Sequence, residues 1–66
     1  MLKYRLEVLY PGEVGAKVAA EVDRATEVMT TIRRLLAEHP GCERIKVYAG
    51  GGFIFAVDCR GDTVER

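Results

Sequence analysis

The sequence predicts an α+β domain in which two β-hairpins flank one amphipathic helix. Two stretches of alternating apolar and polar residues come first, and a stripe of apolar residues at helical spacing follows them. Two further apolar stretches then surround a run of three glycines at 50–52. Alternation with a period of two is typical of half-buried strands, whereas spacings of three and four residues are typical of an amphipathic helix. The predicted order of elements is therefore ββαββ.

The first hairpin is predicted from a single register that suits both faces of a strand pair. Residues 3–10 alternate, but residues 16–22 are ambiguous, because they also fit one long helix from about Glu13 to Glu38. An antiparallel register pairs Tyr4 with Val22, Leu6 with Ala20 and Val8 with Val18. The same register places Arg5 opposite Glu21 on the other face, a favourable cross-strand pair. This agreement favours a strand over residues 16–22.

A helix is predicted over about residues 24–38. Its apolar residues recur at three- and four-residue spacings, and they are Ala25, Val28, Met29, Ile32, Leu35 and Leu36. Such a stripe faces a core, so the threonines and arginines of this segment are expected on the exposed side. Asp23 is expected to cap the N-terminus. The helix is expected to end at His39-Pro40-Gly41, because a residue before proline avoids the α region.

The second hairpin is predicted to pair residues 43–49 with residues 53–59. Its register pairs Ile45 with Val57, Val47 with Phe55 and Ala49 with Phe53, and on the opposite face Arg44 with Asp58 and Tyr48 with Ile54. The last strand is apolar on both faces over Phe53–Val57, which favours a central position. The prediction is a four-stranded, mainly antiparallel sheet in the order 1-2-4-3, with the helix on one face. Residues 1–66 form a single domain, and residues 60–66 are a polar tail.

Composition and charge limit the class of function. The chain has 66 residues and is 48% hydrophobic and 30% charged, which is ordinary for a globular domain. No apolar run reaches the roughly 20 residues of a membrane span, and residues 1–10 lack the apolar region of a signal peptide. Ten basic and ten acidic residues give zero net charge, which disfavours a general binder of polyanions. Two cysteines without a secretory signal favour a reducing cytoplasm.

Structural interpretations outweigh the catalytic and metal-binding ones. The glycines at 50–52 lead into a strand rather than a helix N-terminus, so a hairpin turn is favoured over a phosphate loop. His39, Cys42 and Cys59 are expected at one end of the domain and are the weak candidates for a metal site. Structural zinc needs four ligands, and a catalytic cysteine–histidine pair needs a pocket. We expect no cofactor, no metal and no enzymatic activity.

The two cysteines are predicted to remain reduced. The register places Cys59 opposite Glu43, the neighbour of Cys42, so the two residues are expected to lie close together. Alternation nevertheless points Cys59 toward the helix-covered face and Cys42 away from it, unless Gly41 rotates the chain there. A disulfide needs converging Cβ vectors as well as a short distance, so no disulfide is expected.

The open face of the sheet carries two candidate binding surfaces. Its basic residues are Lys3, Arg5, Lys17, Arg44 and Lys46, which are the candidate contacts for a nucleic acid. Acidic residues share that face, so a charge-paired, solvated surface is favoured. Its apolar residues are Leu9, Tyr48, Ile54 and Ala56. Tyr48 and Ile54 are predicted cross-strand neighbours rimmed by charge, which favours contact with a protein partner or a second copy of the chain.

The order of elements resembles that of several small accessory proteins of phages and mobile elements, including some anti-CRISPR proteins built as a sheet plus one helix. This resemblance covers the layout and no sequence motif. It implies a protein that blocks or modulates a larger complex through its surface. The prediction is a small cytoplasmic protein-interaction or inhibitor module that forms a homodimer, since so small a chain buries little core. The alternative is a nucleic-acid-binding regulator.

Overall fold

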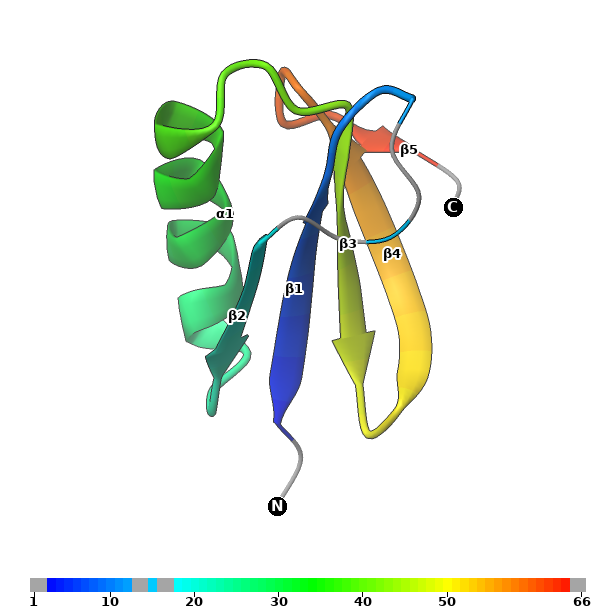
Figure 1. Ribbon diagram of the computed structural model, residues 1–66. Helices are drawn as coiled ribbons and strands as arrows, with labels where there is room; N and C mark the ends of the chain where they lie inside the picture. Colours follow the sequence, from blue (N-terminus) through cyan, green and yellow to red (C-terminus); the bar gives the residue numbers. More distant parts are fainter. Residues whose placement is uncertain (1–2, 13–14, 16–17, 65–66) are drawn as a thin grey trace.

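The fold is one antiparallel sheet with a helix against one face (Figure 1). The computed structural model describes residues 3–12, 15 and 18–64. Its elements are β1 (Tyr4–Leu9), β2 (Val18–Val22), α1 (Thr26–Glu38), β3 (Arg44–Ala49), β4 (Gly52–Asp58) and β5 (Thr63–Val64). The predicted α+β class is confirmed, and the sheet has a fifth strand that was not predicted.

The predicted strand order is wrong, because the order is β2-β1-β3-β4-β5 and β1 lies between β2 and β3. On its β3 side, β1 places Leu6 opposite Val47 on the helix-covered face and Glu7 opposite Lys46 on the open face. The apolar residues of β4 had suggested that β4 was central. An antiparallel sheet can leave one face in water, so a strand with charged residues on that face can also be central.

The first hairpin is confirmed over the part of the predicted strand that the structure describes. Within Val18–Val22, β2 pairs with β1 in the predicted register, including Arg5 opposite Glu21. Residues 16–17 of the predicted strand lie outside the described residues. The alternative of one long helix through this segment is wrong, since Val18–Val22 is extended.

The helix begins two residues later than predicted, and Asp23 does not cap it. Ala25 occupies the N-cap position with helical backbone angles and makes no side-chain capping hydrogen bond. The backbone N–H of Glu27 donates to the carbonyl oxygen of Arg24 over 3.0 Å, so a tight backbone turn starts the helix instead. The helix ends before His39, as predicted. No helix in the described part of the chain is long and apolar enough to span a membrane.

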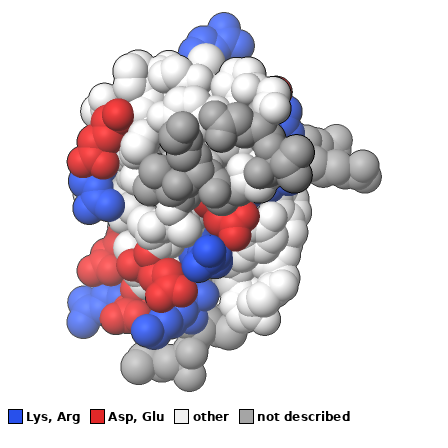
Figure 2. All heavy atoms as spheres, viewed as in Figure 1, with Lys and Arg blue, Asp and Glu red and all other residues white. Residues whose placement is uncertain are grey.

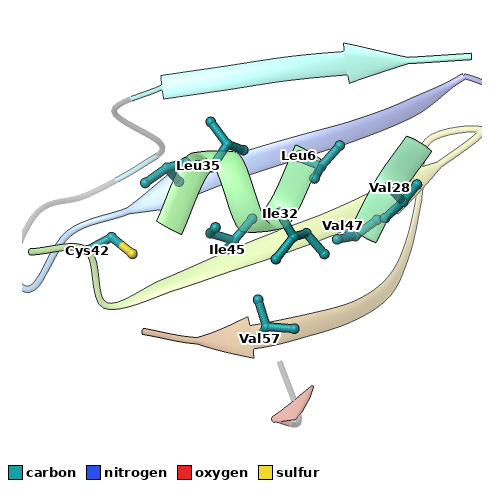
Figure 3. Close-up of a cluster of buried hydrophobic side chains, with 9 residues drawn as sticks. Leu6, Val28, Ile32, Leu35, Cys42, Ile45, Val47 and Val57 are labelled. Carbon is teal, nitrogen blue, oxygen red and sulfur yellow. The ribbon is translucent and has the colours of Figure 1, made fainter. Parts of the chain in front are cut away.

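The core lies between α1 and the helix-covered face of β1, β3 and β4 (Figure 3). Its buried members are Leu6, Val8, Val28, Ile32, Leu35, Cys42, Ile45, Val47 and Val57. Two residues of the predicted helical stripe, Ala25 and Met29, are exposed, whereas Thr31 is buried against expectation. The buried positions of α1 are Val28, Thr31, Ile32 and Leu35. They form a narrow line along the helix, so Met29 falls at the margin of the contact with the sheet.

The turn of the second hairpin is tighter than predicted. Gly50 and Gly51 have φ values of 59° and 86°, and positive φ at both central residues is the requirement of a type I′ turn. Gly52 therefore already belongs to β4 and lies opposite Ala49. The predicted pairing of Ala49 with Phe53 is wrong, because two glycines rather than three form the turn.

A β-bulge reconciles this tight turn with the core. Deeper in the hairpin, Ile45 lies opposite Val57, as predicted. Near the turn, Tyr48 lies opposite Phe53 and not opposite Ile54, and the register shifts between these two regions. Ile54 is the extra residue of β4 at this shift. Such a bulge redirects the side chains on the strand that carries it.

The segment predicted as a polar tail, residues 60–66, contains β5. Oδ1 of Asp58 accepts hydrogen bonds from the backbone N–H groups of Arg60 and Asp62, at 2.9 and 3.0 Å. The carboxylate thereby stabilises the turn that brings Thr63–Val64 back alongside β4.

Truncation of Ile32 to alanine is expected to lower the free energy of unfolding by about 2–5 kcal/mol, because this core side chain is only 1% exposed. Urea denaturation followed by circular dichroism measures the loss. Arg33→Ala, on the exposed side of the same helix, is the control and is expected to change the free energy by less than about 0.5 kcal/mol. Equal losses for the two variants would contradict the packing of α1.

The pKa of Asp58 lies below its usual range, because the N–H groups of Arg60 and Asp62 bind its charged form. The hydrogen bonds therefore stabilise the turn when the pH is above the unfolded-state pKa of about 3.9. This stabilisation is lost as the pH falls through the lower folded-state pKa. We expect the carboxyl ¹³C signal of Asp58 to titrate below pH ~3.9 in the folded protein. In Asp58→Asn, the amide signals of Arg60 and Asp62 are expected to lose the part of their pH dependence that follows the Asp58 carboxyl signal. An ordinary midpoint for Asp58 would contradict these hydrogen bonds.

Candidate interaction surface

Three large apolar side chains are substantially exposed in the described part of the chain. Met29 is 46% exposed, Phe53 is 44% exposed and Ile54 is 47% exposed. Met29 lies in the first half of α1, and the other two lie on β4 directly after the β3–β4 turn. The start of α1 and this turn lie at the same end of the molecule (Figure 1). We call the surface formed by Met29, Phe53 and Ile54 the apolar tip.

A hollow of about 300 Å³ opens on the helix side of the apolar tip. Its lining residues are Tyr4, Ala25, Val28, Met29, Ile54 and Phe55. Ile54 and Phe55 are neighbours in the chain, and in a regular strand their side chains would point to opposite faces. The bulge allows both to line the hollow on the helix side.

The open-face side of the apolar tip carries an aromatic pair. The rings of Tyr48 and Phe53 have centroids 5.7 Å apart and planes at 73°, an edge-to-face contact. Phe53 thus occupies the position beside Tyr48 that was predicted for Ile54. Phe53 and Met29 are surface residues that the sequence analysis missed. The sequence carried no signal for Phe53, because three consecutive glycines fit a turn of two or of three residues, and that choice decides which face Phe53 occupies.

The four predicted interaction residues do not form one patch. Ile54 lines the hollow on the helix side, whereas Tyr48 contacts Phe53. Leu9 is half-buried, and Ala56 is completely buried where β4 lies between β3 and β5. Binding through any of the four stays a prediction.

The basic residue Arg5 is paired with acidic neighbours on the open face. Its Nε lies 2.9 Å from Oε2 of Glu7, and its Nη1 lies 3.8 Å from Oε2 of Glu21. The hydrogen bond from Arg5 to Glu7 raises the pKa of the guanidinium. This cation is therefore already balanced within the chain.

The remaining candidate nucleic-acid contacts do not form a separate basic strip among the described residues. Lys46 and Arg44 are half-buried, and each lies opposite an acidic residue of a neighbouring strand. Lys3 is exposed, and Lys17 lies outside the described residues. Figure 2 shows basic and acidic groups next to one another on the face in view. This mixture offers little attraction for a polyanion.

His39 is held by an aromatic neighbour. The hydroxyl oxygen of Tyr10 and Nδ1 of His39 share a hydrogen bond of 2.8 Å, and the two rings meet edge to face. Within the described ranges, no three His, Cys, Asp or Glu residues lie together in a way that could hold a metal ion. The expected independence from metal stays a prediction.

The side-chain orientations that strand alternation predicts for the two cysteines are reversed, since Cys42 is buried in the core and Cys59 is exposed. Strand alternation does not apply to either residue. Cys42 precedes the first residue of β3, Arg44, and Cys59 follows the last residue of β4, Asp58. Both positions belong to turns, which orient their side chains independently of the strands. Both cysteines are free thiols.

Comparison with protein-family models, with curated proteins and with solved structures finds no match to this chain. The resemblance in layout to small phage accessory proteins therefore stays a prediction.

Burial raises the pKa of the Cys42 thiol, and the nearby Cys59 raises it further. Because the thiolate is the reactive form, we expect iodoacetamide to modify Cys59 readily in the folded protein and Cys42 only after unfolding. Mass spectrometry of timed samples measures both reactions. Cys59→Ser is expected to remove the fast reaction. Equal rates for the two thiols in the folded protein would contradict the burial of Cys42.

Proposed function

We propose that this chain is a non-enzymatic protein-interaction module that binds a large apolar side chain of a partner protein at the apolar tip. The observation that carries the proposal is the hollow bordered by Met29 and Ile54, two apolar side chains that are each nearly half exposed. Anchor residues in protein interfaces typically fill pockets that lose their water when the partner binds. Burial of the apolar lining supplies the main favourable free energy for association.

The size and the lack of charge of this surface favour an apolar side chain as the occupant. A volume of about 300 Å³ is at the lower limit of pockets that hold small molecules, so the hollow suits one side chain better than a larger ligand. All six lining residues are uncharged. Figure 2 shows uncharged surface over the β3–β4 hairpin, away from the mixed charges on the rest of the face in view.

The biological setting is part of the proposal. The resemblance in layout supports a cytoplasmic inhibitor or modulator that acts on a larger complex through this surface. A nucleic-acid-binding regulator is the less supported alternative, because the described basic residues of the open face lie among acidic ones.

A displayed peptide library tests the proposal without knowledge of the partner. Peptides that bind the protein are expected to share one large apolar residue and to shift the amide signals of Val28, Met29 and Phe55. Met29→Lys is expected to weaken binding at least tenfold, because it places a charge at the rim of the hollow. Thr30→Lys adds the same charge at the next exposed helix position and is the matched control.

Three outcomes would overturn the proposal. They are selected peptides without a shared apolar residue, amide shifts confined to other surfaces, and equal binding by the Met29→Lys and Thr30→Lys variants. Circular dichroism of both variants confirms that each is folded, which is expected because both positions are exposed.

A further inference from the structure

We propose that two copies of this chain associate through the outer edge of β2, antiparallel about a twofold axis at Ala20. β2 forms one end of the sheet order, and no described strand pairs with its outer side. An edge strand presents unpaired backbone N–H and C=O groups, which form a template for another strand. The other end of the sheet is β5, which has only two residues, Thr63–Val64. A very short edge strand is itself a protection against pairing, so β2 is the competent edge.

The edge of β2 lacks the features that usually prevent strand addition. The strand has no proline, and its pairing with β1 is regular over Val18–Val22, with no bulge that would twist the edge away. Its one charged residue is Glu21, and the carboxylate of Glu21 lies 3.8 Å from the guanidinium of Arg5. That charge is therefore partly balanced within the chain, and it does little to repel a second strand.

In this register, β2 can pair with a copy of itself without placing like charges opposite each other. Ala20 is the middle residue of the five, so an axis at Ala20 pairs the strand over its full length. The pairing places Ala19 opposite Glu21 of the second copy and keeps the two Glu21 carboxylates apart. An axis at Glu21 would place these like charges directly opposite each other, which is destabilising. A register that pairs all five residues of β2 and keeps the two Glu21 carboxylates apart favours a second copy of the chain as the partner.

The association does not use the residues of the apolar tip, although Tyr4, which lines the hollow, lies opposite Val22 of β2. The apolar tip lies on β4 and the start of α1, and β4 is separated from β2 by two other strands. The twofold axis is perpendicular to the sheet, so both helices lie on the same face of one continuous sheet. The chain carries zero net charge, so no long-range repulsion opposes the approach of two copies. The dimer and the function proposed above therefore depend on different residues and are tested by different variants.

Opposite charges at Ala19 test the register. Ala19→Lys places a cation opposite Glu21 of the second copy, twice per dimer, and Ala19→Glu places an anion there. We expect the dimer dissociation constant to fall by about two- to thirtyfold in Ala19→Lys and to rise by a similar factor in Ala19→Glu. Sedimentation velocity between micromolar and millimolar concentrations measures both constants. Because Ala19 also lies opposite Glu7 of its own chain, thermal unfolding of the dilute monomer measures the intrachain effect separately.

A second measurement locates the contact directly. In a mixture of ¹³C-labelled and unlabelled protein, we expect intermolecular nuclear Overhauser effects between Ala20 of the two copies. Ile54→Lys is the control variant and is expected to leave the dimer unchanged, because Ile54 lies at the apolar tip.

The proposal is overturned by a monomer at millimolar concentration, by a dissociation constant that responds equally to both charges at Ala19, or by a dimer that Ile54→Lys disrupts. The last result would place the contact between copies at the apolar tip. Peptide binding at the tip is measured separately, so failure of the dimer and failure of the proposed function are distinguishable.

Discussion

The pairing of β1 along both of its edges is the interaction on which the rest of the structure depends. β1 joins β2 to β3, and it contributes Leu6 and Val8, both fully buried, to the core. β3 then carries β4, and β4 carries β5. The helix covers the face on which these apolar residues lie, and the charged residues of β1 remain on the open face. Loss of β1 pairing would therefore separate the sheet into two parts and expose the core.

The first hairpin was predictable because one register satisfied both of its faces at once. The strand order was not, because an order with β4 between β2 and β3 also makes every neighbouring pair antiparallel. The signal that distinguishes the two orders is present in the residues. β1 and β3 are complementary in the observed register, with Leu6 opposite Val47 and Glu7 opposite Lys46. The prediction used the apolar character of both faces of β4, which an antiparallel sheet does not require of a central strand, and did not compare β1 with β3.

The second hairpin contains two constraints that disagree by one residue. The type I′ turn at Gly50-Gly51 sets one register, and the packing of Ile45 with Val57 sets another. The bulge at Ile54 satisfies both, because an extra residue on one strand absorbs the difference. Three consecutive glycines are compatible with a turn of two residues or of three. The sequence pattern therefore could not distinguish these turns, and the faces of Phe53 and Ile54 depended on that choice.

The apolar tip arises where two regular patterns fail at the same place. Met29 fits the apolar stripe of the helix in the sequence, but the narrow contact between α1 and the sheet leaves it at the margin. Ile54 fits strand alternation, but the bulge turns it toward the helix side. A single exposed apolar residue needs no explanation, whereas exposed apolar residues gathered around a hollow are typical of a contact surface. Positions at which a sequence departs from the ideal pattern of its helix or strand are often functional. In this chain, the same two departures form the apolar tip, and they are also the reason why the periodic pattern of the sequence did not predict it.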